Sequence, residues 1–275
     1  MPKIGVFDSG YGGLTVLRSL LDRLPQFDFV YLGDNARAPY GNRSFETVYQ
    51  YTLQCVNWLF DQADCDLVIL ACNTASAKAL RQIQQCDLPL RSTPKRLLGV
   101  IRPTTEQLGE YTRSGHVGIL GTQGTVDSQS YPIELAKFFP ELFVSQEACP
   151  LWVPLVEEGR LQEPESHALI QERLDALMAQ DEQIDTLLLA CTHYPLLLPL
   201  LEQHAAPGMR LLSQGDLVAE RLEDYLRRHS AFASHLDQNS DLTFFTTGDS
   251  EQFRSRALVF FGQEVKAESV QMGEV

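Results

Sequence analysis

Two kinds of hydrophobic pattern alternate along the chain. Short, continuous apolar runs predict buried strands, and longer segments with an apolar residue at every third or fourth position predict amphipathic helices. The first strands are expected in "KIGVF", "FDFVYL" and "DLVILA", and the first helices in "GGLTVLRSLLDRL", over residues 44–63, and from residue 73 or 74 towards 85. This alternation is typical of a parallel sheet with helices on both faces.

The alternation then begins again. Further strands are expected in "LLGVI", "HVGILG", "LFVSQEA" and "DTLLLA", and helices after Pro103, from about Asp127, over 151–158 and 164–180, and after Pro195. The chain ends with "MRLLS", a helix over 216–228, "LTFFTT", a helix over 250–261 and "EVKAESV". The sequence therefore predicts two α/β units of similar design.

One strand-end sequence occurs twice. "DLVILACNTASA" and "DTLLLACTHYP" both place a cysteine directly after a buried strand, and polar residues follow each cysteine. Upstream, "IGVFDSGYGG" is echoed by "VGILGTQGT", which sets Asp8 and Thr122 at similar distances before Cys72 and Cys191. Ligands bind beyond the carboxyl ends of parallel strands. Such a duplication therefore predicts that the two cysteines lie at equivalent strand ends and face one cleft.

The composition narrows the range of partners. The chain has 275 residues, 44% of them hydrophobic, which is enough for two domains with cores of their own. A formal charge of −14 at pH 7 disfavours binding to nucleic acid or to an anionic membrane. No apolar stretch is long enough for a signal peptide or a membrane span, so we expect a soluble, cytoplasmic protein. The basic segment 91–102 is interpreted as a solvated connection.

The cysteines are not arranged for structural cross-links. All six are expected to be free thiols, because a cytosolic chain of this size neither needs nor readily keeps disulfides. They form no CxxC pair, so no metal site is expected. Those outside the duplicated sequence are interpreted as packing residues, namely Cys55, Cys65, Cys86 and Cys149.

Two thiols in one cleft leave several mechanisms open. A cysteine at the start of a helix can have a lowered pKa and can act as nucleophile or base. Cys191 and His193 could form a hydrolase pair, and two sulfurs within bonding distance could run dithiol redox chemistry. Two thiols on opposite sides of one carbon could instead invert its configuration, one removing a proton and the other returning one. Either cysteine alone could be a packing residue, and the duplication is what favours function.

Seven motifs in the chain resemble, in order, those of bacterial glutamate racemases. They are "FDSGYGGLTVLR", "YLGDNARAPYG", "ILACNTASA", "GILGTQGTVDSQSY", "CPLWVPLVEEG", "LLLACTHYPLL" and "FFTTGDSEQF", and they span nearly the whole chain. The resemblance implies an enzyme without a cofactor that interconverts L- and D-glutamate and supplies D-glutamate for peptidoglycan. It also implies an α/β fold of two pseudo-symmetric, flavodoxin-like domains with parallel sheets and an active site in the cleft between them.

The resemblance also assigns roles to individual residues. It implies that Cys72 deprotonates D-glutamate and that Cys191 deprotonates L-glutamate, with Asp8 assisting the first thiol and His193 the second. Glu157 is matched to a further carboxylate near the site. We expect Asp8 to raise the pKa of Cys72, and a protonated His193 to favour the other thiolate. The positions assigned to substrate binding are Asp8, Ser9, Tyr40, Gly41, Asn73, Thr74, Thr122, Thr125, Thr192 and His193.

The order of the motifs implies a discontinuous first domain. It would comprise residues 1–98 and 213–275, with the second domain, 99–212, inserted between them. The segment "CDLPLRSTPKRLLGVIRP" matches the family least well and could form a contact in a homodimer. The alternatives are a related racemase or decarboxylase acting on aspartate, hydantoins or malonates, and a binding protein that kept the fold. Such enzymes look less like this chain at "DSGYGGL" and "DNARAPYG", and a binding protein would not need both cysteines.

Overall fold

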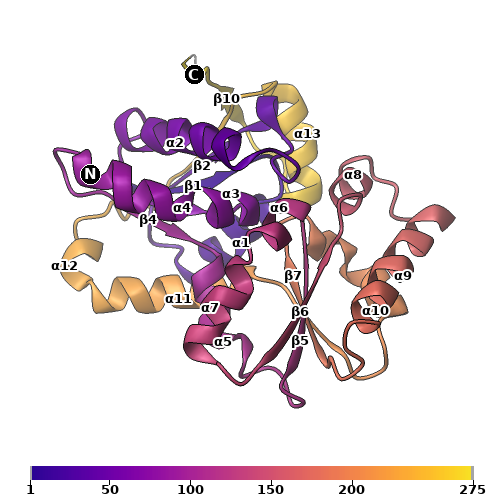
Figure 1. Ribbon diagram of the computed structural model, residues 1–275. Helices are drawn as coiled ribbons and strands as arrows, with labels where there is room; N and C mark the ends of the chain where they lie inside the picture. Colours follow the sequence, from indigo (N-terminus) through magenta and orange to yellow (C-terminus); the bar gives the residue numbers. More distant parts are fainter. Residues whose placement is uncertain (1, 274–275) are drawn as a thin grey trace.

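The computed structural model describes residues 2–273, and its strands form two parallel sheets (Figure 1). The first sheet has the strand order β10-β9-β2-β1-β3-β4, and the second has the order β6-β5-β7-β8. Strands β1 to β4 of the first sheet therefore occupy the same relative positions as strands β5 to β8 of the second sheet. The prediction of an α/β fold built from two similar units with parallel sheets is confirmed.

The first sheet is built from both ends of the chain, and the second from its middle. The first contains β1 (Lys3–Asp8), β2 (Phe29–Gly33), β3 (Cys65–Leu70), β4 (Arg96–Gly99), β9 (Leu242–Thr246) and β10 (Ala267–Ser269). The second contains β5 (His116–Gly121), β6 (Phe143–Ala148), β7 (Thr186–Ala190) and β8 (Arg210–Leu212). Gly99, which the sequence assigned to the second domain, is thus the last residue of a strand in the first sheet.

Helices connect the strands of each unit. Those around the first sheet are α1 (Leu14–Arg23), α2 (Phe45–Asp61), α3 (Asn73–Lys78), α4 (Leu80–Gln82), α11 (Gly215–Arg228), α12 (Ser230–Ala233) and α13 (Ser250–Phe261). Those around the second are α5 (Ile101–Leu108), α6 (Gln123–Asp127), α7 (Ser130–Phe138), α8 (Trp152–Glu157), α9 (Pro164–Met178) and α10 (Leu198–His204). Shorter helical turns lie at Asn35–Arg37, Ile83–Asp87, Leu88–Leu90 and Tyr194–Leu197.

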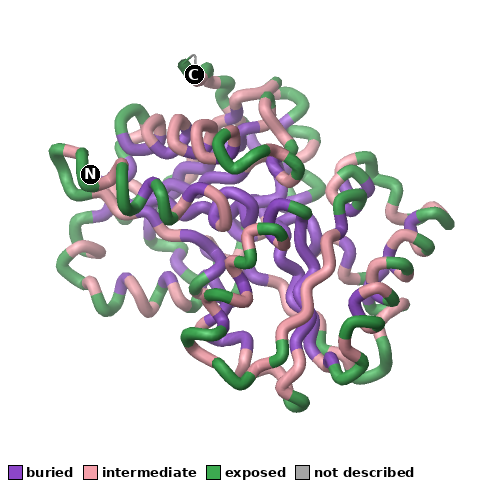
Figure 2. Tube along the Cα trace, in the orientation of Figure 1, coloured by how far each residue is buried: buried purple, intermediate pink, exposed green. Residues whose placement is uncertain are grey.

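The central strands β1, β2, β3, β5 and β7 are almost entirely buried, which explains why they are continuously apolar rather than alternating (Figure 2). In β1, Val6 belongs to the same apolar cluster as Leu17 of α1, whereas the next residue, Phe7, belongs to the cluster that contains Val48 of α2. In β7, Leu189 belongs to the cluster that includes residues of α9, whereas its neighbour Leu188 belongs to the cluster that includes residues of α7. Successive side chains point to opposite faces of a strand, so each face has its own helical layer.

The structure corrects one predicted helix start. The sequence placed a helix from about Asp127, but α6 begins earlier, where the Thr122 hydroxyl accepts a hydrogen bond from the Thr125 N–H at 3.3 Å and caps it. Gln129 then takes a left-handed backbone conformation (φ 55°) that separates α6 from α7. Thr122 is therefore held at a helix start rather than in a loop.

Two further interpretations near the end of the first unit are wrong. The basic segment 91–102 contains β4 and is not simply a solvated connection, because Lys95 pairs with Asp66 at 2.5 Å and the Arg96 guanidinium lies 3.9 Å from the ring centroid of Phe232. Cys86 lies in an exposed helical turn and is not a packing residue, whereas Cys55, Cys65 and Cys149 are buried as expected. All six cysteines are free thiols, as predicted.

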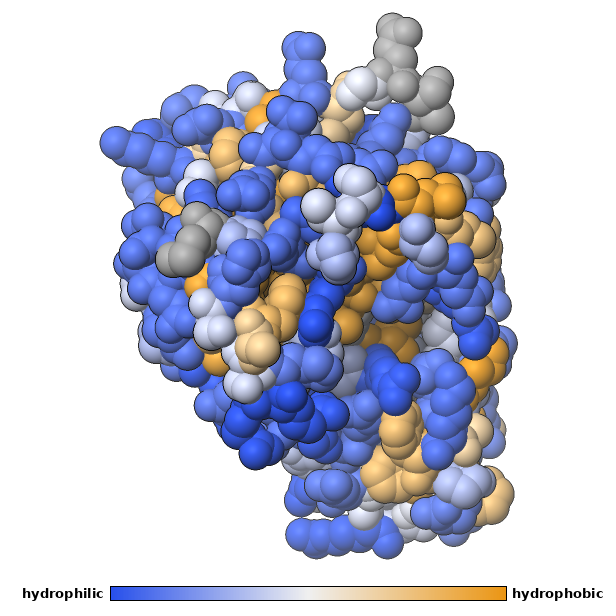
Figure 3. Space-filling model, turned by 90° about the vertical axis from the view of Figure 1, so that its left-hand side faces the viewer, coloured by the Kyte–Doolittle hydropathy of each residue, from blue (hydrophilic) through white to orange (hydrophobic). Residues whose placement is uncertain are grey.

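The surface is mainly hydrophilic on the side that carries α12 and α11. Figure 3 shows this face, where apolar side chains lie between charged and polar ones. Across residues 2–273, the helices all lack the length or the apolar character needed to cross a membrane.

Candidate functional site

One cleft lies between the two units, at the carboxyl ends of their strands. Residues that follow β1, β2, β3, β5, β6 and β7 contribute to it, which is where ligands bind in parallel sheets. It is lined by Ser9, Gly10, residues 38–42, Cys72, Asn73, Thr74, Thr122, Pro150, Val153, Pro154, Glu157, Cys191, Thr192 and His193. Both cysteines of the duplicated sequence thus line the same cleft, one from each sheet.

Cys72 follows β3 and is held as a protonated thiol. Its Sγ accepts a hydrogen bond from the Ala75 N–H at 3.4 Å, and its thiol donates to the Ser9 hydroxyl at 3.4 Å. Burial, together with the nearby Asp8 carboxylate, raises the pKa of Cys72 to about 12. The expectation that the helix start would lower this pKa is wrong, because burial outweighs the effect of the six-residue α3. The expected effect of Asp8 is confirmed.

Cys191 follows β7 and has a different neighbour. His193 Nε2 lies 2.9 Å from Glu157 Oε1, and the imidazole packs edge-on against the ring of Phe260. Burial opposes its charge, but hydrogen bonds with Cys191 and Glu157 outweigh burial and raise the pKa of His193 to about 10. A protonated imidazole therefore stands beside the Cys191 thiol at neutral pH.

Asp8 lies behind the lining of the cleft. Its fully buried carboxylate accepts hydrogen bonds from the Gly10 N–H at 2.9 Å and from the Thr192 hydroxyl at 3.3 Å. Burial raises the pKa of Asp8 itself. Because Thr192 belongs to the second unit, Asp8 joins the two units next to the cleft.

The glycine-rich "DSGYGG" allows the two units to approach each other closely. A Cβ added at Gly12 would lie 2.2 Å from Thr192 Oγ1 and 2.5 Å from His193 Nδ1, which is closer than such atoms can pack. The absence of a side chain at this position therefore admits the residues that follow Cys191.

Threonines join the two sides of the cleft floor. The hydroxyls of Thr74 and Thr122 lie 2.9 Å apart, and Thr122 also contacts the Thr125 hydroxyl at 3.0 Å. Nearby, the Gly124 N–H donates to the Gly41 carbonyl at 2.9 Å. Thr125 is fully buried and lies behind the lining, so it contacts the cleft through Thr122.

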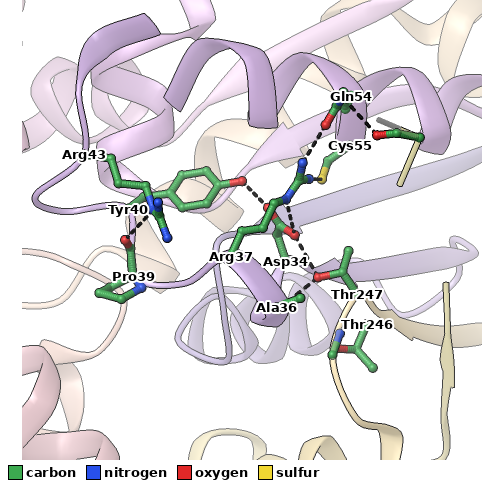
Figure 4. Close-up of polar contacts among 12 residues, drawn as sticks. Asp34, Ala36, Arg37, Pro39, Tyr40, Arg43, Gln54, Cys55, Thr246 and Thr247 are labelled. Atoms are coloured by element: carbon green, nitrogen blue, oxygen red, sulfur yellow. Dashed lines mark hydrogen bonds and ion pairs between the residues drawn. The ribbon is translucent and has the colours of Figure 1, made fainter. Parts of the chain in front are cut away.

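A buried carboxylate holds the loop that carries Tyr40 and Gly41 (Figure 4). Asp34 is fully buried, pairs with the Arg37 guanidinium at 2.8 Å and accepts hydrogen bonds from the hydroxyls of Thr247 (2.7 Å) and Tyr40. Burial, along with the neighbouring acidic groups, raises the pKa of Tyr40 far above its usual value. Tyr40 thus lines the cleft with its hydroxyl hydrogen already committed to Asp34.

Part of the cleft wall was not predicted from the sequence. The missed lining residues that carry side chains are Ala38, Pro39, Asn42, Pro150, Val153 and Pro154. The last three all lie in "CPLWVPLVEEG", the motif that contributed only Glu157 to the prediction. Apart from Asn42, these are small apolar residues and prolines, which have no chemistry of their own that a sequence pattern could reveal. Across residues 2–273, no group of three or more His, Cys, Asp or Glu side chains is placed to hold a metal ion.

Comparisons with known proteins agree with this arrangement. The sequence profile of the Asp/Glu/Hydantoin racemase family matches residues 4–222. A glutamate racemase of Bacillus cereus is 39% identical over 263 residues, which are 96% of this chain and 94% of that protein.

Two solved structures match nearly the whole chain. The crystal structure of glutamate racemase isoform RacE1 from Bacillus anthracis has a TM-score of 0.88 and 33% identity, covering 98% of this chain and 97% of that one. Glutamate racemase from Francisella tularensis, solved in complex with D-glutamate, has a TM-score of 0.85 and 30% identity over the same shares. This chain therefore belongs to the Asp/Glu/Hydantoin racemase family.

Proposed function

We propose that the protein interconverts L- and D-glutamate by a two-base mechanism in which Cys72 and Cys191 act on opposite faces of the substrate Cα. The observation that supports this most directly is that one thiol from each sheet lines the same cleft. Inverting a stereocentre requires a base on one face and an acid on the other, and equivalent strand ends facing each other provide both. The similarity to glutamate racemases supports glutamate as the substrate.

The groups beside the two thiols favour the L-to-D direction. Cys191 as thiolate would remove the Cα proton of L-glutamate, and the protonated His193 beside it would balance the charge of that thiolate. Cys72, a neutral thiol with a pKa of about 12, would return a proton to the other face. In the reverse direction Cys72 must first lose its proton. The positively charged amino group of the substrate would favour that loss.

Uncharged donors would hold the two carboxylates of the substrate. Among the described residues that line the cleft, neither Arg nor Lys occurs. Ser9, Thr74, Thr122 and Thr192 bring hydroxyl groups to the lining, and Asn73 brings an amide. Donors fixed in this way would also stabilise the negative charge that develops on the carboxylate as the Cα proton leaves.

The product has a defined place in metabolism under this proposal. D-Glutamate made in the cytoplasm would supply peptidoglycan synthesis, as the resemblance to bacterial glutamate racemases implies. No step of the reaction as written requires a cofactor or a metal ion, since thiols perform both proton transfers.

Circular dichroism tests the proposal directly. The signal of L-glutamate should decay to zero in the presence of the purified protein, without added pyridoxal phosphate or metal ion. L-Aspartate, tested under the same conditions, serves as the competing substrate. A stable L-glutamate signal would overturn the proposed activity, and a faster decay with L-aspartate would transfer it to the rival substrate.

A further inference from the structure

A ring of three hydrogen bonds surrounds the side chain of Asn73. Asn73 Nδ2 donates to Gln214 Oε1, Gln214 Nε2 donates to the Tyr131 hydroxyl, and that hydroxyl donates to Asn73 Oδ1, each at 2.6 Å. The three residues are between 0% and 4% exposed. They come from the start of α3, from the residue before α11 and from α7, so the ring joins the two units.

The direction of this ring is set outside it, chiefly by the hydroxyl of Thr104 on α5, while the Val100 carbonyl is a more distant acceptor for Gln214 Nε2, at 3.5 Å. That hydroxyl donates its hydrogen to the Val100 carbonyl at 2.7 Å. Its oxygen can therefore only accept the hydrogen bond from Gln214 Nε2, which is 3.0 Å away. The amide of Gln214 must then turn its nitrogen towards Thr104 and Tyr131 and its oxygen towards Asn73.

The fixed direction determines what Asn73 presents to the cleft. Its oxygen accepts from Tyr131, and one of its two amide hydrogens binds Gln214. The second amide hydrogen can be donated into the cleft, which Asn73 lines. A reversed amide would turn its oxygen in that direction instead, and an oxygen repels a carboxylate.

The ring lies where the chain passes between the units. Val100 follows β4 at the first crossing, and Gln214 comes shortly after β8 at the second. Gln107 of α5 also donates to the Leu217 carbonyl of α11 at 3.0 Å, which ties the two crossing segments together. The orientation of Asn73 thus depends on how these segments pack.

We propose that Thr104, Gln214 and Tyr131 are positioning residues that hold the Asn73 amide with an N–H directed at a substrate carboxylate. The inference rests on the proposed function, since it assigns that carboxylate to glutamate. It concerns substrate binding and not proton transfer, so the loss of the ring should raise KM and leave kcat nearly unchanged.

Thr104→Val and Thr104→Ser form a matched pair of variants. Valine has the shape of threonine but no oxygen, whereas serine keeps the oxygen and loses a methyl group. Thr104→Val should raise KM for both enantiomers about fivefold to tenfold, as expected when a hydrogen bond to a charged group is weakened. Thr104→Ser should keep KM within about twofold of the original protein. Tyr131→Phe, which removes only a hydroxyl from the ring, should raise KM in the same way.

A double-mutant cycle separates positioning from a general structural effect. In an Asn73→Ala background, Thr104→Val should have no further effect on KM, because the amide on which it acts is gone. An unchanged KM in both Thr104→Val and Tyr131→Phe would overturn the inference, as would a full effect that persists without Asn73. If the original protein fails to racemise glutamate, the proposed function falls and this inference falls with it. Active protein with unaffected variants overturns the inference alone.

Discussion

The two cysteines occupy matching places in the fold but have unlike surroundings. Cys72 contacts a serine hydroxyl and lies near the buried Asp8, which together with burial keeps its proton bound. Cys191 lies beside His193, which holds a positive charge with the help of Glu157. Four strands have the same order in both sheets, and the difference arises in the side chains around each cysteine. Asp8 is the last residue of β1, His193 follows β7, and Glu157 ends α8.

This contrast shows which part of the site the scaffold determines. Equivalent strand ends decide that two thiols face one cleft, because the same strand order brings β3 and β7 to equivalent positions. The neighbours of each thiol differ: burial and Asp8 favour the neutral form of Cys72, and a protonated His193 stands beside Cys191. Under the proposed mechanism, a symmetric scaffold with unlike neighbours can assign the acid to one side and the base to the other.

Removing either thiol gives the largest expected effect. Cys72→Ala and Cys191→Ala should each lower racemisation by about 10³-fold or more, since under the proposed two-base mechanism each deletes a group that transfers a proton. The two variants should nevertheless differ in deuterium oxide. Cys72→Ala keeps the base for L-glutamate and should exchange the Cα hydrogen of L-glutamate, whereas Cys191→Ala should exchange that of D-glutamate.

Proton NMR of the Cα signal measures this exchange for each enantiomer separately. The corresponding alanine variant of the exposed Cys86 is the control, and it should racemise and exchange normally. Normal racemisation by either cleft variant would sink the two-base assignment. Equal exchange of both enantiomers by one variant would show that the two thiols do not divide the faces between them.

A substitution at His193 tests the charged side of the comparison. Its pKa is about 10 in the folded protein and about 6.5 in an unfolded chain, so the folded state keeps a proton that the unfolded state loses between these values. The resulting stabilisation is fully present below about pH 6.5 and is lost as the pH rises through 10. His193→Gln lacks it and should unfold more easily at pH 6, by on the order of a few kcal/mol.

Urea unfolding of both proteins at pH 6 and at pH 10 measures this difference. The gap in unfolding free energy between the original protein and His193→Gln should narrow at the higher pH. A gap of constant size would show that His193 contributes packing against Phe260 rather than charge.

Part of the candidate site could be predicted from the sequence, and part of it could not. Cys72 and Cys191 stand out because each interrupts an apolar run with a reactive group, and the repeat makes chance unlikely as an explanation. The walls formed by Pro150 and Val153 carry no such signal. The pairing of Asn73 with Gln214 joins residues far apart in the chain, so local patterns could not reveal it.

The protonation of Cys72 shows a different limit of the sequence. A position at a helix start lowers the pKa of a cysteine thiol, but the sequence does not reveal how deeply that thiol is buried. Burial and the Asp8 carboxylate both act against the charged form, and in the structure they prevail over the short helix. Competing effects on one group can be ranked only when its surroundings in space are known.

The smallest predicted effect separates the two causes that keep Cys72 protonated. Asp8→Asn removes the charge and keeps a group that can bind the Gly10 N–H, so burial is left as the main cause. The pKa of Cys72 should fall by roughly one unit, and alkylation of this thiol by iodoacetamide at pH 8 should become about tenfold faster. Mass spectrometry can follow Cys72 and the exposed Cys86 in the same sample, and only Cys72 should respond.

An unchanged rate at Cys72 would mean that burial alone keeps the thiol neutral. Asp8 would then act mainly by binding Thr192, and the difference between the two sides of the cleft would arise at His193.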